Sequence, residues 1–161
     1  MPIVLRGLAL VVLTASGALA QPAGPVGTWL NQDKDGIVQI GDCGLLRGQP
    51  ASGALCGNVA WIRDAVDRTT GRPPVDGKNA DPALRNRPIL GLTVLSDLRP
   101  ASSNRWDGRI YNIDDGKSYT AKVTLIADNQ LQVEGCVLLI CRGETWTRQA
   151  LPATQPARPA R

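Results

Sequence analysis

The sequence contains no histidine, and this absence excludes several kinds of catalytic site. Ser-His-Asp and Cys-His arrangements both need an imidazole as the general base. The chain also lacks a Gly-x-Ser-x-Gly motif and a glycine-rich phosphate-binding loop before a helix. Hydrolysis by carboxylates alone stays open, although adjacent acids such as Asp114 and Asp115 are typical of a turn. We therefore predict no catalytic residues and a protein that is not an enzyme.

Phenylalanine is also absent, so the bulky apolar mass of the chain depends on four tryptophans and two tyrosines. These six side chains are expected to dominate either the core or the wall of a cavity. The net charge of +4 is modest, and no run of basic residues is interleaved with aromatic ones. This composition gives no support for binding of nucleic acid.

The first twenty residues have the pattern of a cleaved export signal. Arg6 supplies a positive start, and residues 7–15 form an apolar stretch that is too short to span a bilayer. Ala18-Leu19-Ala20 then fits a small-x-small cleavage site, and no cysteine follows it. We expect cleavage after Ala20, no transmembrane segment in the mature chain, and a periplasmic or secreted location.

Four cysteines in an exported chain indicate disulfides, and three pairings are possible. Cys43 and Cys56 flank a glycine-rich turn between two strand-like runs, and Cys136 and Cys141 flank four apolar residues. We predict these two local pairs. A zinc site would need more closely spaced ligand pairs and preferably histidines, so no metal or cofactor is expected.

Between residues 21 and 150 the chain reads as a series of short strands separated by turn signals. The predicted strands are 27–30, 37–40, 55–62, 89–95, 105–111, 119–125, 131–134 and 144–148. About eight such strands with almost no helix predict an all-β fold, either a sandwich or an up-and-down barrel. Closure into a barrel would remove exposed strand edges, so we predict a small antiparallel up-and-down β-barrel. The interior of such a barrel holds packed side chains or one small ligand. Residues 151–161, rich in Pro, Ala and Arg, are expected to form a disordered tail.

One short helical turn is predicted near residues 81–86, after a long irregular loop at 63–79. Asp81 is a good N-cap, and Pro82 suits the first helical position, where its missing N–H costs nothing. Pro88 ends the turn, because the residue before a proline avoids the helical region. This segment is expected to lie at the mouth of the barrel.

Two arginines in this segment have two possible roles. Arg85 and Arg87 are candidates to bind an anionic end of a ligand at the barrel mouth, since arginine suits bidentate contacts with anions. The alternative is that they bond to backbone carbonyls and to Asp76 or Asp81, and so order the long loop.

Four aromatic residues, Trp61, Trp106, Tyr111 and Tyr119, are candidates to line a ligand pocket, with plain core packing as the alternative. Trp106 and Tyr111 alternate onto opposite faces of one predicted strand. Only one of those two can therefore point into the barrel unless a bulge intervenes.

The motifs near the two ends of the domain resemble the lipocalin pattern. These are Gly27-x-Trp29 near the start and Trp146-x-Arg148 near the end. In that pattern an arginine stacks on the first-strand tryptophan and closes the base of the barrel. The resemblance implies a structural cation–π contact between Trp29 and Arg148, on the order of 1 kcal/mol.

A longer set of motifs is similar to the bacterial exported family called domain of unknown function 2147 (DUF2147). In chain order the motifs are Gly27-x-Trp29, Cys43…Leu55-Cys56-Gly57, Asp81-Pro82-x-Leu84-Arg85-x-Arg87-Pro88, Gly91-Leu92, Trp106-x-Gly108-x-Ile110-Tyr111, Gly116-Lys117-x-Tyr119, Leu131-x-Val133-x-Gly135 and Trp146-x-Arg148. The resemblance covers residues 26–148. It implies a lipocalin-like barrel in the cell envelope and no established activity.

The sequence is compatible with three functions. The first is binding of a small apolar or amphipathic molecule inside the barrel, with Arg85 and Arg87 near the entrance. The second is an envelope protein-interaction module with a filled core, which contacts a partner through loop 63–79. The third is a carboxylate-based hydrolase.

Overall fold

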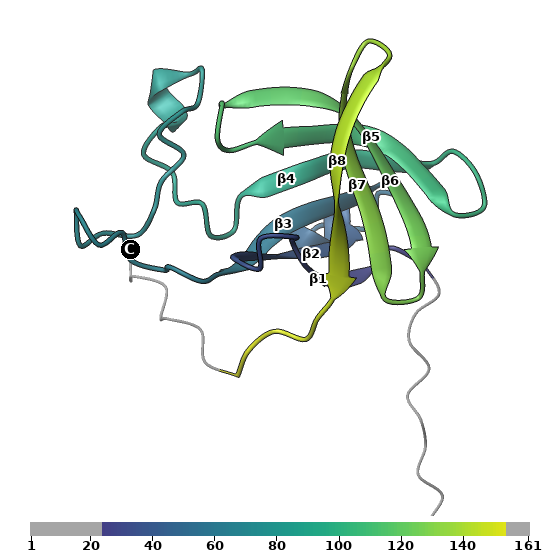
Figure 1. Cartoon of the computed structure of the whole chain (residues 1–161), viewed down its shortest axis with the longest axis horizontal. Coiled ribbons are helices and arrows are strands. Elements are labelled where there is room, and N and C mark those ends of the chain that lie inside the picture. The colour runs from purple at the N-terminus through teal and green to yellow at the C-terminus, as the bar shows by residue number, and fades with distance from the viewer. Residues whose placement is uncertain (1–23, 154–161) are drawn as a thin grey trace, which may run out of the picture.

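Eight antiparallel strands form a closed barrel in the computed structural model, which describes residues 24–153 (Figure 1). The strands are β1 (Gly27–Leu30), β2 (Gly36–Asp42), β3 (Leu55–Ile62), β4 (Thr93–Pro100), β5 (Arg105–Asn112), β6 (Lys117–Ala127), β7 (Gln130–Val137) and β8 (Ile140–Arg148). Each strand pairs with the next one in the sequence, and β8 pairs back to β1. This confirms the predicted up-and-down barrel. The predicted signal at 1–20 and most of the predicted tail lie outside the described residues.

The helical segments are short, and only one of them was predicted. The 3₁₀ helix η1 (Pro82–Leu84) has Asp81 as its N-cap, with a bond from the Ala83 N–H to the Asp81 carboxylate of 2.9 Å. The second, α1 (Cys43–Leu46), lies in a segment predicted as a loose turn. Its N-cap Asp42 accepts hydrogen bonds from the backbone N–H groups of four residues, Gly44, Leu45, Ser52 and Gly53. These bonds lower the pKa of Asp42 to about 2, the bond from Ser52 most of all.

One strand begins later than predicted. The sequence pattern places its start at residue 89, but β4 begins at Thr93 and continues to Pro100. The backbone N–H of Ile89 instead bonds to the carbonyl of Pro74 in the long loop, at 3.1 Å. The first apolar residues after Pro88 therefore contact the long loop, and strand pairing begins only after them.

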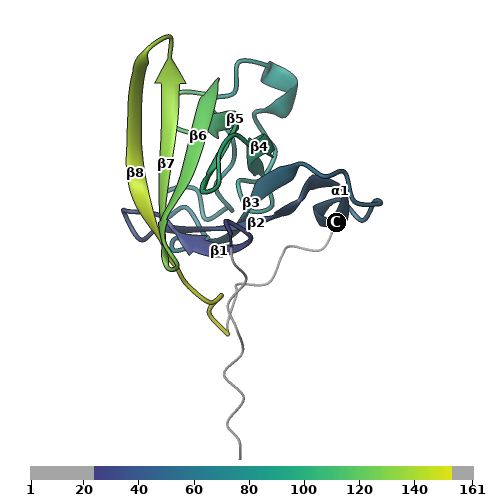
Figure 2. The same ribbon diagram turned by 90° about the vertical axis from the view of Figure 1, so that its right-hand side faces the viewer.

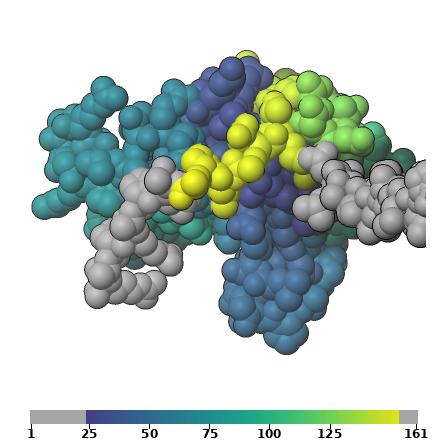
Figure 3. Space-filling view, turned by 90° about the horizontal axis from the view of Figure 1, so that it is seen from below, coloured from purple at the N-terminus to yellow at the C-terminus, as the bar shows by residue number. Residues whose placement is uncertain are grey.

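The two ends of the barrel carry different connections, because the strands run alternately up and down. The mouth carries the turn 31–35, the long loop 63–92, the turn 113–116 and the tip 138–139. The closed end carries residues 24–26, the segment 43–54 and the turns 101–104 and 128–129. Figure 2 shows the β7–β8 hairpin extending well beyond β1 and β2 at the mouth. Figure 3 shows the segment around 43–54 (blue) and the long loop (teal) as two projections from the barrel.

Trp29 and Arg148 seal the closed end, as the lipocalin resemblance implies. The Arg148 guanidinium lies 4.1 Å from the centre of the Trp29 ring, and Trp29 has no exposed surface. Arg148 also donates hydrogen bonds to the carbonyls of Gly24, Val26 and Asp128, each at 2.9 Å. Residues 24–26 and the turn 128–129 are thereby held against one side chain.

The closed half of the barrel is filled by apolar side chains. Six inward-facing residues have no accessible surface: Trp29, Leu95, Leu98, Ala121, Val123 and Leu131. A side chain with no accessible surface touches no void that a water molecule could enter. Together with their neighbours these residues form one continuous cluster. A ligand therefore has no room in this half unless the core rearranges.

Both predicted disulfides are present, Cys43–Cys56 beside α1 and Cys136–Cys141 near the tip of the β7–β8 hairpin.

Replacing Cys43 and Cys56 by serine is expected to lower the free energy of unfolding by about 3 kcal/mol, because the bond closes a loop and restricts the unfolded chain. The shorter loop closed by Cys136 and Cys141 predicts a loss of about 2 kcal/mol for its double variant. Urea denaturation of both variants checks the order of these losses, and a larger loss for Cys136 and Cys141 would contradict the loop-length account.

Candidate ligand site at the barrel mouth

A buried carboxylate, Asp76, organises the long loop at the mouth. Its Oδ2 accepts hydrogen bonds from Arg87 Nε at 2.9 Å, Arg87 Nη2 at 2.8 Å and Asn79 Nδ2 at 2.8 Å. Its Oδ1 accepts the Tyr111 hydroxyl at 2.6 Å. Asp76 has no exposed surface, so the loop is fastened to β5 by a charged group that water does not reach.

The pKa of Asp76 reflects two opposing effects. Burial raises the pKa of its carboxyl, but the hydrogen bonds from Tyr111, Asn79 and Arg87 and the positive charge of Arg87 outweigh burial, so the pKa lies below its ordinary value. Burial and the neighbouring Asp76 carboxylate raise the pKa of Tyr111. The network therefore holds an ionised carboxylate and a neutral phenol.

The two arginines of the loop have the structural contacts that were considered as the alternative role. Arg87 pairs with Asp76, and Arg85 Nε donates to the backbone carbonyl of Asn79 at 2.8 Å. The Arg87 guanidinium also lies 5.5 Å from the centre of the Tyr111 ring. Neither contact requires a bound anion.

A glycine in the β5–β6 turn lets the loop approach closely. A Cβ atom at Gly116 would lie 1.9 Å from the carbonyl oxygen of Lys78, and Gly116 has a φ of +70°. Any other residue would collide with the loop at this point. The loop is thus fixed against both β5 and the turn that follows it.

The four candidate aromatic residues do not gather in one place. Trp106 faces the interior and Tyr111 faces outward, as their alternation predicts, and Tyr111 contacts the long loop. Tyr119 is paired with Ile110 on the inner face at the mouth, and its hydroxyl donates to Asp115. Trp61 pairs with Ile37 across a register shift and is not among the described residues packed against the main core.

The inner wall of β5–β8 is built as cross-strand rows. One row consists of Trp106, Val123, Val133 and Glu144, which are paired strand by strand. The next row towards the mouth contains the small residues Gly108, Ala121 and Gly135, followed by Arg142. A Cβ atom at Gly135 would lie 3.3 Å from Ile110, which packs over this row. Above it the inner wall becomes partly accessible at Ile110 and Tyr119.

Glu144 is an inward-facing carboxyl that the sequence analysis did not select. It pairs with the buried Val133, and one of its oxygens accepts the Trp146 indole N–H at 2.5 Å. Burial raises the pKa of Glu144; the bond from Trp146 opposes this, and the charges of Asp33 and Asp35 add to it. The signal was in the sequence, because a residue two positions from the inward Trp146 must face the same side.

The barrel has a short seam next to Glu144. β8 extends from Ile140 to Arg148, but β1 pairs with it only at Arg148 and Thr147. Towards the mouth, the Thr145 N–H bonds to the side chain of Gln32 rather than to a strand. Glu144 therefore lies on the inner wall where β8 has lost its neighbour on one side.

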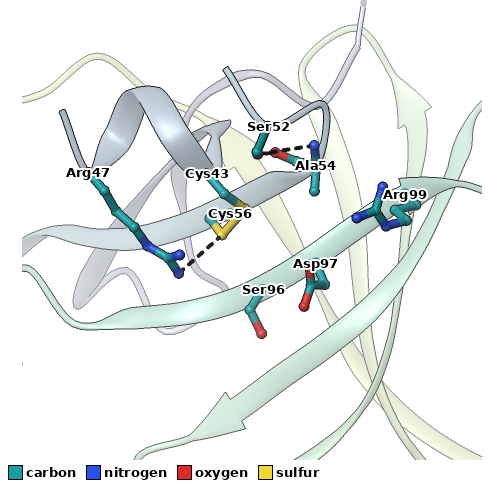
Figure 4. Close-up of a pocket in the computed structure, with 8 residues that line it drawn as sticks. All are labelled: Cys43, Arg47, Ser52, Ala54, Cys56, Ser96, Asp97 and Arg99. Atoms are coloured by element: carbon teal, nitrogen blue, oxygen red, sulfur yellow. Dashed lines mark hydrogen bonds between the residues drawn. A yellow bond between two sulfur atoms is a disulfide. The ribbon is translucent and has the colours of Figure 1, made fainter. Parts of the chain in front are cut away.

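A separate pocket of about 150 Å³ lies outside the barrel interior, beside the Cys43–Cys56 disulfide (Figure 4). Arg47, Asp97 and Arg99 line it, and Arg47 Nη2 lies 4.0 Å from Cys56 Sγ. Asp97 has a φ of +52°, where β4 shifts register against β5. Typical ligand pockets measure about 300–1,000 Å³, so this one suits only a very small polar group.

The fold and its sealed closed end define a lipocalin-like barrel. The structure of protein HP1028 from the human pathogen Helicobacter pylori, described as belonging to the lipocalin family, is similar with a TM-score of 0.63 and 22% sequence identity. The match covers 78% of this chain and 82% of that chain, and at this identity it shows the fold alone. A comparison with curated protein sequences gives no match.

The family is shown by the sequence itself. A family model described as "Uncharacterized protein conserved in bacteria (DUF2147)" matches residues 27–148. The chain belongs to this family, as the motifs indicate. Among residues 24–153, no helix is long and apolar enough to cross a membrane. Two disulfides in a bacterial family fit a periplasmic or extracellular protein.

Proposed function

We propose that the protein binds a small amphipathic molecule in the mouth half of its barrel. The observation that carries this proposal is the change in the inner wall between Ala121, which is fully buried, and Tyr119, which is partly accessible. The partly buried carboxyl of Glu144 faces inward beside Val133, one row below Ala121. An apolar wall with a few placed polar groups is the usual composition of a small-molecule site.

The geometry limits the size and polarity of the ligand. A long acyl chain would have to displace Leu98 or Leu131, which have no accessible surface, so the ligand is short. The carboxylates of Asp33 and Asp35 act on Glu144. A cationic or hydrogen-bond-donating end therefore complements Glu144 better than an anionic one, and Arg142 lies one row nearer the mouth. In this proposal Arg85 and Arg87 order the entrance.

The test uses displacement of an apolar fluorescent dye by octylamine and by octanoate. Octylamine is expected to displace the dye, and Glu144→Gln is expected to weaken its binding roughly tenfold, the loss of about one charge-assisted contact. Because the pKa of Glu144 is raised by burial, its ionised form accumulates only above the ordinary range of a glutamate, and octylamine binding is expected to tighten as the pH rises through that pKa. Equal binding of octylamine by Glu144→Gln and the parent protein would contradict the role of the carboxyl.

A second variant tests the location. Gly135→Val adds bulk beside Ile110 and Tyr119, and is expected to block binding of both probes and the dye. Thr120→Val is the matched control, because it is a substitution on the outer face of the neighbouring β6 and leaves the mouth unchanged. Dye binding that survives Gly135→Val in a folded protein would place the ligand elsewhere.

The filled closed half also favours a second function, an interaction module that acts through its surface. The long loop is ordered by the Asp76 network, so it is available as a fixed surface for a partner. This function would be favoured if the parent protein, with Glu144 and Gly135 unchanged, bound none of the amphipathic probes.

A further inference from the structure

The tip of the β7–β8 hairpin is apolar and almost completely exposed. The exposed fractions of its four residues are 57% for Val137, 95% for Leu138, 98% for Leu139 and 73% for Ile140. We call residues 136–141, which include these four and the two bonded cysteines, the apolar tip. Figure 2 shows the hairpin standing free of the rest of the barrel at its mouth end.

The apolar tip violates two local preferences at once. Leu138 has a φ of +55°, in the left-handed region where glycine is favoured in hairpin turns. Leu138 and Leu139 also expose nearly their whole side chains, so packing within the described chain does not compensate for the strain. A residue that is unfavourable both for the turn and for solubility indicates a role outside the fold.

The cross-link fixes the shape of the apolar tip. Cys136 and Cys141 face each other across the hairpin, with Val137 opposite Ile140 and the two leucines at the turn. The disulfide therefore keeps the four apolar residues together at the end of the hairpin. Arg142 is the only charged residue between Gly135 and Gly143, and it is exposed.

We propose that the apolar tip inserts into the interfacial region of a lipid bilayer that contains anionic lipids. A standard protein–protein interface takes about 20–30 residues from each side, and this tip supplies only four apolar ones. Shallow binding to a bilayer gains strength from the apolar area that it buries and from the attraction of cations to anionic lipids, and the apolar tip with Arg142 offers both. The long Arg142 side chain can reach lipid phosphates while the leucines contact the acyl chains.

Insertion of the apolar tip would orient the barrel on the membrane. The tip lies at the mouth end of the barrel, so insertion brings the mouth towards the bilayer surface. An amphipathic molecule at that surface would then be close to the mouth. The two exposed leucines at the turn, Leu138 and Leu139, lie beyond the strand pairs that carry Glu144 and Gly135, so removing them tests insertion separately from the proposed ligand site.

The experiment measures sedimentation of the mature, oxidised protein with phosphatidylcholine vesicles, with and without phosphatidylglycerol. Leu138→Gly with Leu139→Ser is expected to weaken binding roughly hundredfold, about tenfold for each leucine side chain removed from the bilayer. Glycine relieves the turn at position 138, so this double variant retains the hairpin. Arg142→Gln is expected to lower binding only to the vesicles with phosphatidylglycerol.

The matched control is Ile126→Ser, which removes an apolar side chain that is 51% exposed at the closed end. It is expected to bind vesicles as the parent protein does. Equal vesicle binding by the leucine variant and the parent protein, or no binding by the parent protein, would overturn the proposal. Self-association of the parent protein without vesicles, abolished in the leucine variant, would assign the tip to a second copy instead. Octylamine displacement by the leucine variant is expected to be unchanged, which separates this proposal from the proposed function.

Discussion

Replacing Trp29 by alanine is expected to lower the free energy of unfolding by about 4 kcal/mol, the range usual for a fully buried tryptophan. Trp29 has no exposed surface, and its indole N–H donates to the carbonyl of Pro25 at 2.7 Å. The substitution would leave a cavity at the closed end and remove the ring on which Arg148 stacks at 4.1 Å. Thermal and urea unfolding followed by far-ultraviolet circular dichroism measure this loss.

Trp61→Ala is the matched control for Trp29→Ala. Trp61 is only partly buried, and it lies outside the main core cluster of the described chain. We expect a loss of about 1 kcal/mol, the centre of the range for ordinary substitutions. Losses of similar size in the two variants would contradict the account of Trp29 as the seal of the closed end. Binding of octylamine by folded Trp29→Ala is expected to persist, because Trp29 does not contact the mouth.

Replacing Asp76 by alanine is expected to lower the free energy of unfolding by about 3 kcal/mol, the low end for breaking a buried ion pair. The low end applies because Arg87 is 36% exposed, so water can hydrate its charge once Asp76 is gone. The remaining loss comes from Tyr111 and Asn79, which each lose a hydrogen-bond partner. We expect loop 63–92 to lose protection from hydrogen exchange before the strands do. Asp64→Ala is the control, because its ion pair with Arg68 is exposed and is worth less than about 1 kcal/mol.

The pH dependence of stability gives an independent test of Asp76. Its pKa is lowered in the folded protein, so its contribution is complete above the unfolded pKa of about 4 and is lost as the pH falls through the folded value. Asp42, whose pKa is lowered to about 2, also stabilises the fold less as the pH falls, but it does so equally in the parent protein and in Asp76→Ala. The difference in stability between the parent protein and Asp76→Ala should therefore shrink below pH 4, and a constant difference would contradict the ionised pair.

The barrel could be predicted from the sequence because its strands and turns are determined by residues that are close together in the chain. Alternation such as Trp106, Gly108 and Ile110 against Asp107, Arg109 and Tyr111 determines which face of β5 is inside. Turn residues then separate the strands, and closure removes free edges. The same local reasoning identified the Asp81 N-cap, because capping depends on residues only a few positions apart.

The start of β4 and the helix α1 could not be predicted in this way. The backbone at Ile89 is occupied by a bond to Pro74, fifteen residues earlier in a loop with no periodic pattern. The helix α1 depends on Asp42, which also accepts bonds from Ser52 and Gly53 on the far side of the loop. Contacts of this kind are set by tertiary structure and leave no periodic signal.

The candidate site was predicted only in part. Arg87 and Tyr111 were selected separately as ligand residues, but the structure brings them together around Asp76 on the outer face of β5. Nothing in sequence spacing shows that a loop carboxylate will be fully buried. Glu144 was not predicted as a site residue, although its spacing of two positions from Trp146 places it on the inner wall.

We propose that the mouth half of the barrel holds a small amphipathic molecule above a filled core. The decisive experiment is native mass spectrometry of the protein, purified gently from its own cells and then mixed with octylamine. We expect a single added mass that is released on unfolding and is absent from Gly135→Val. A bare chain with two disulfides, with no added mass from either source, would contradict it.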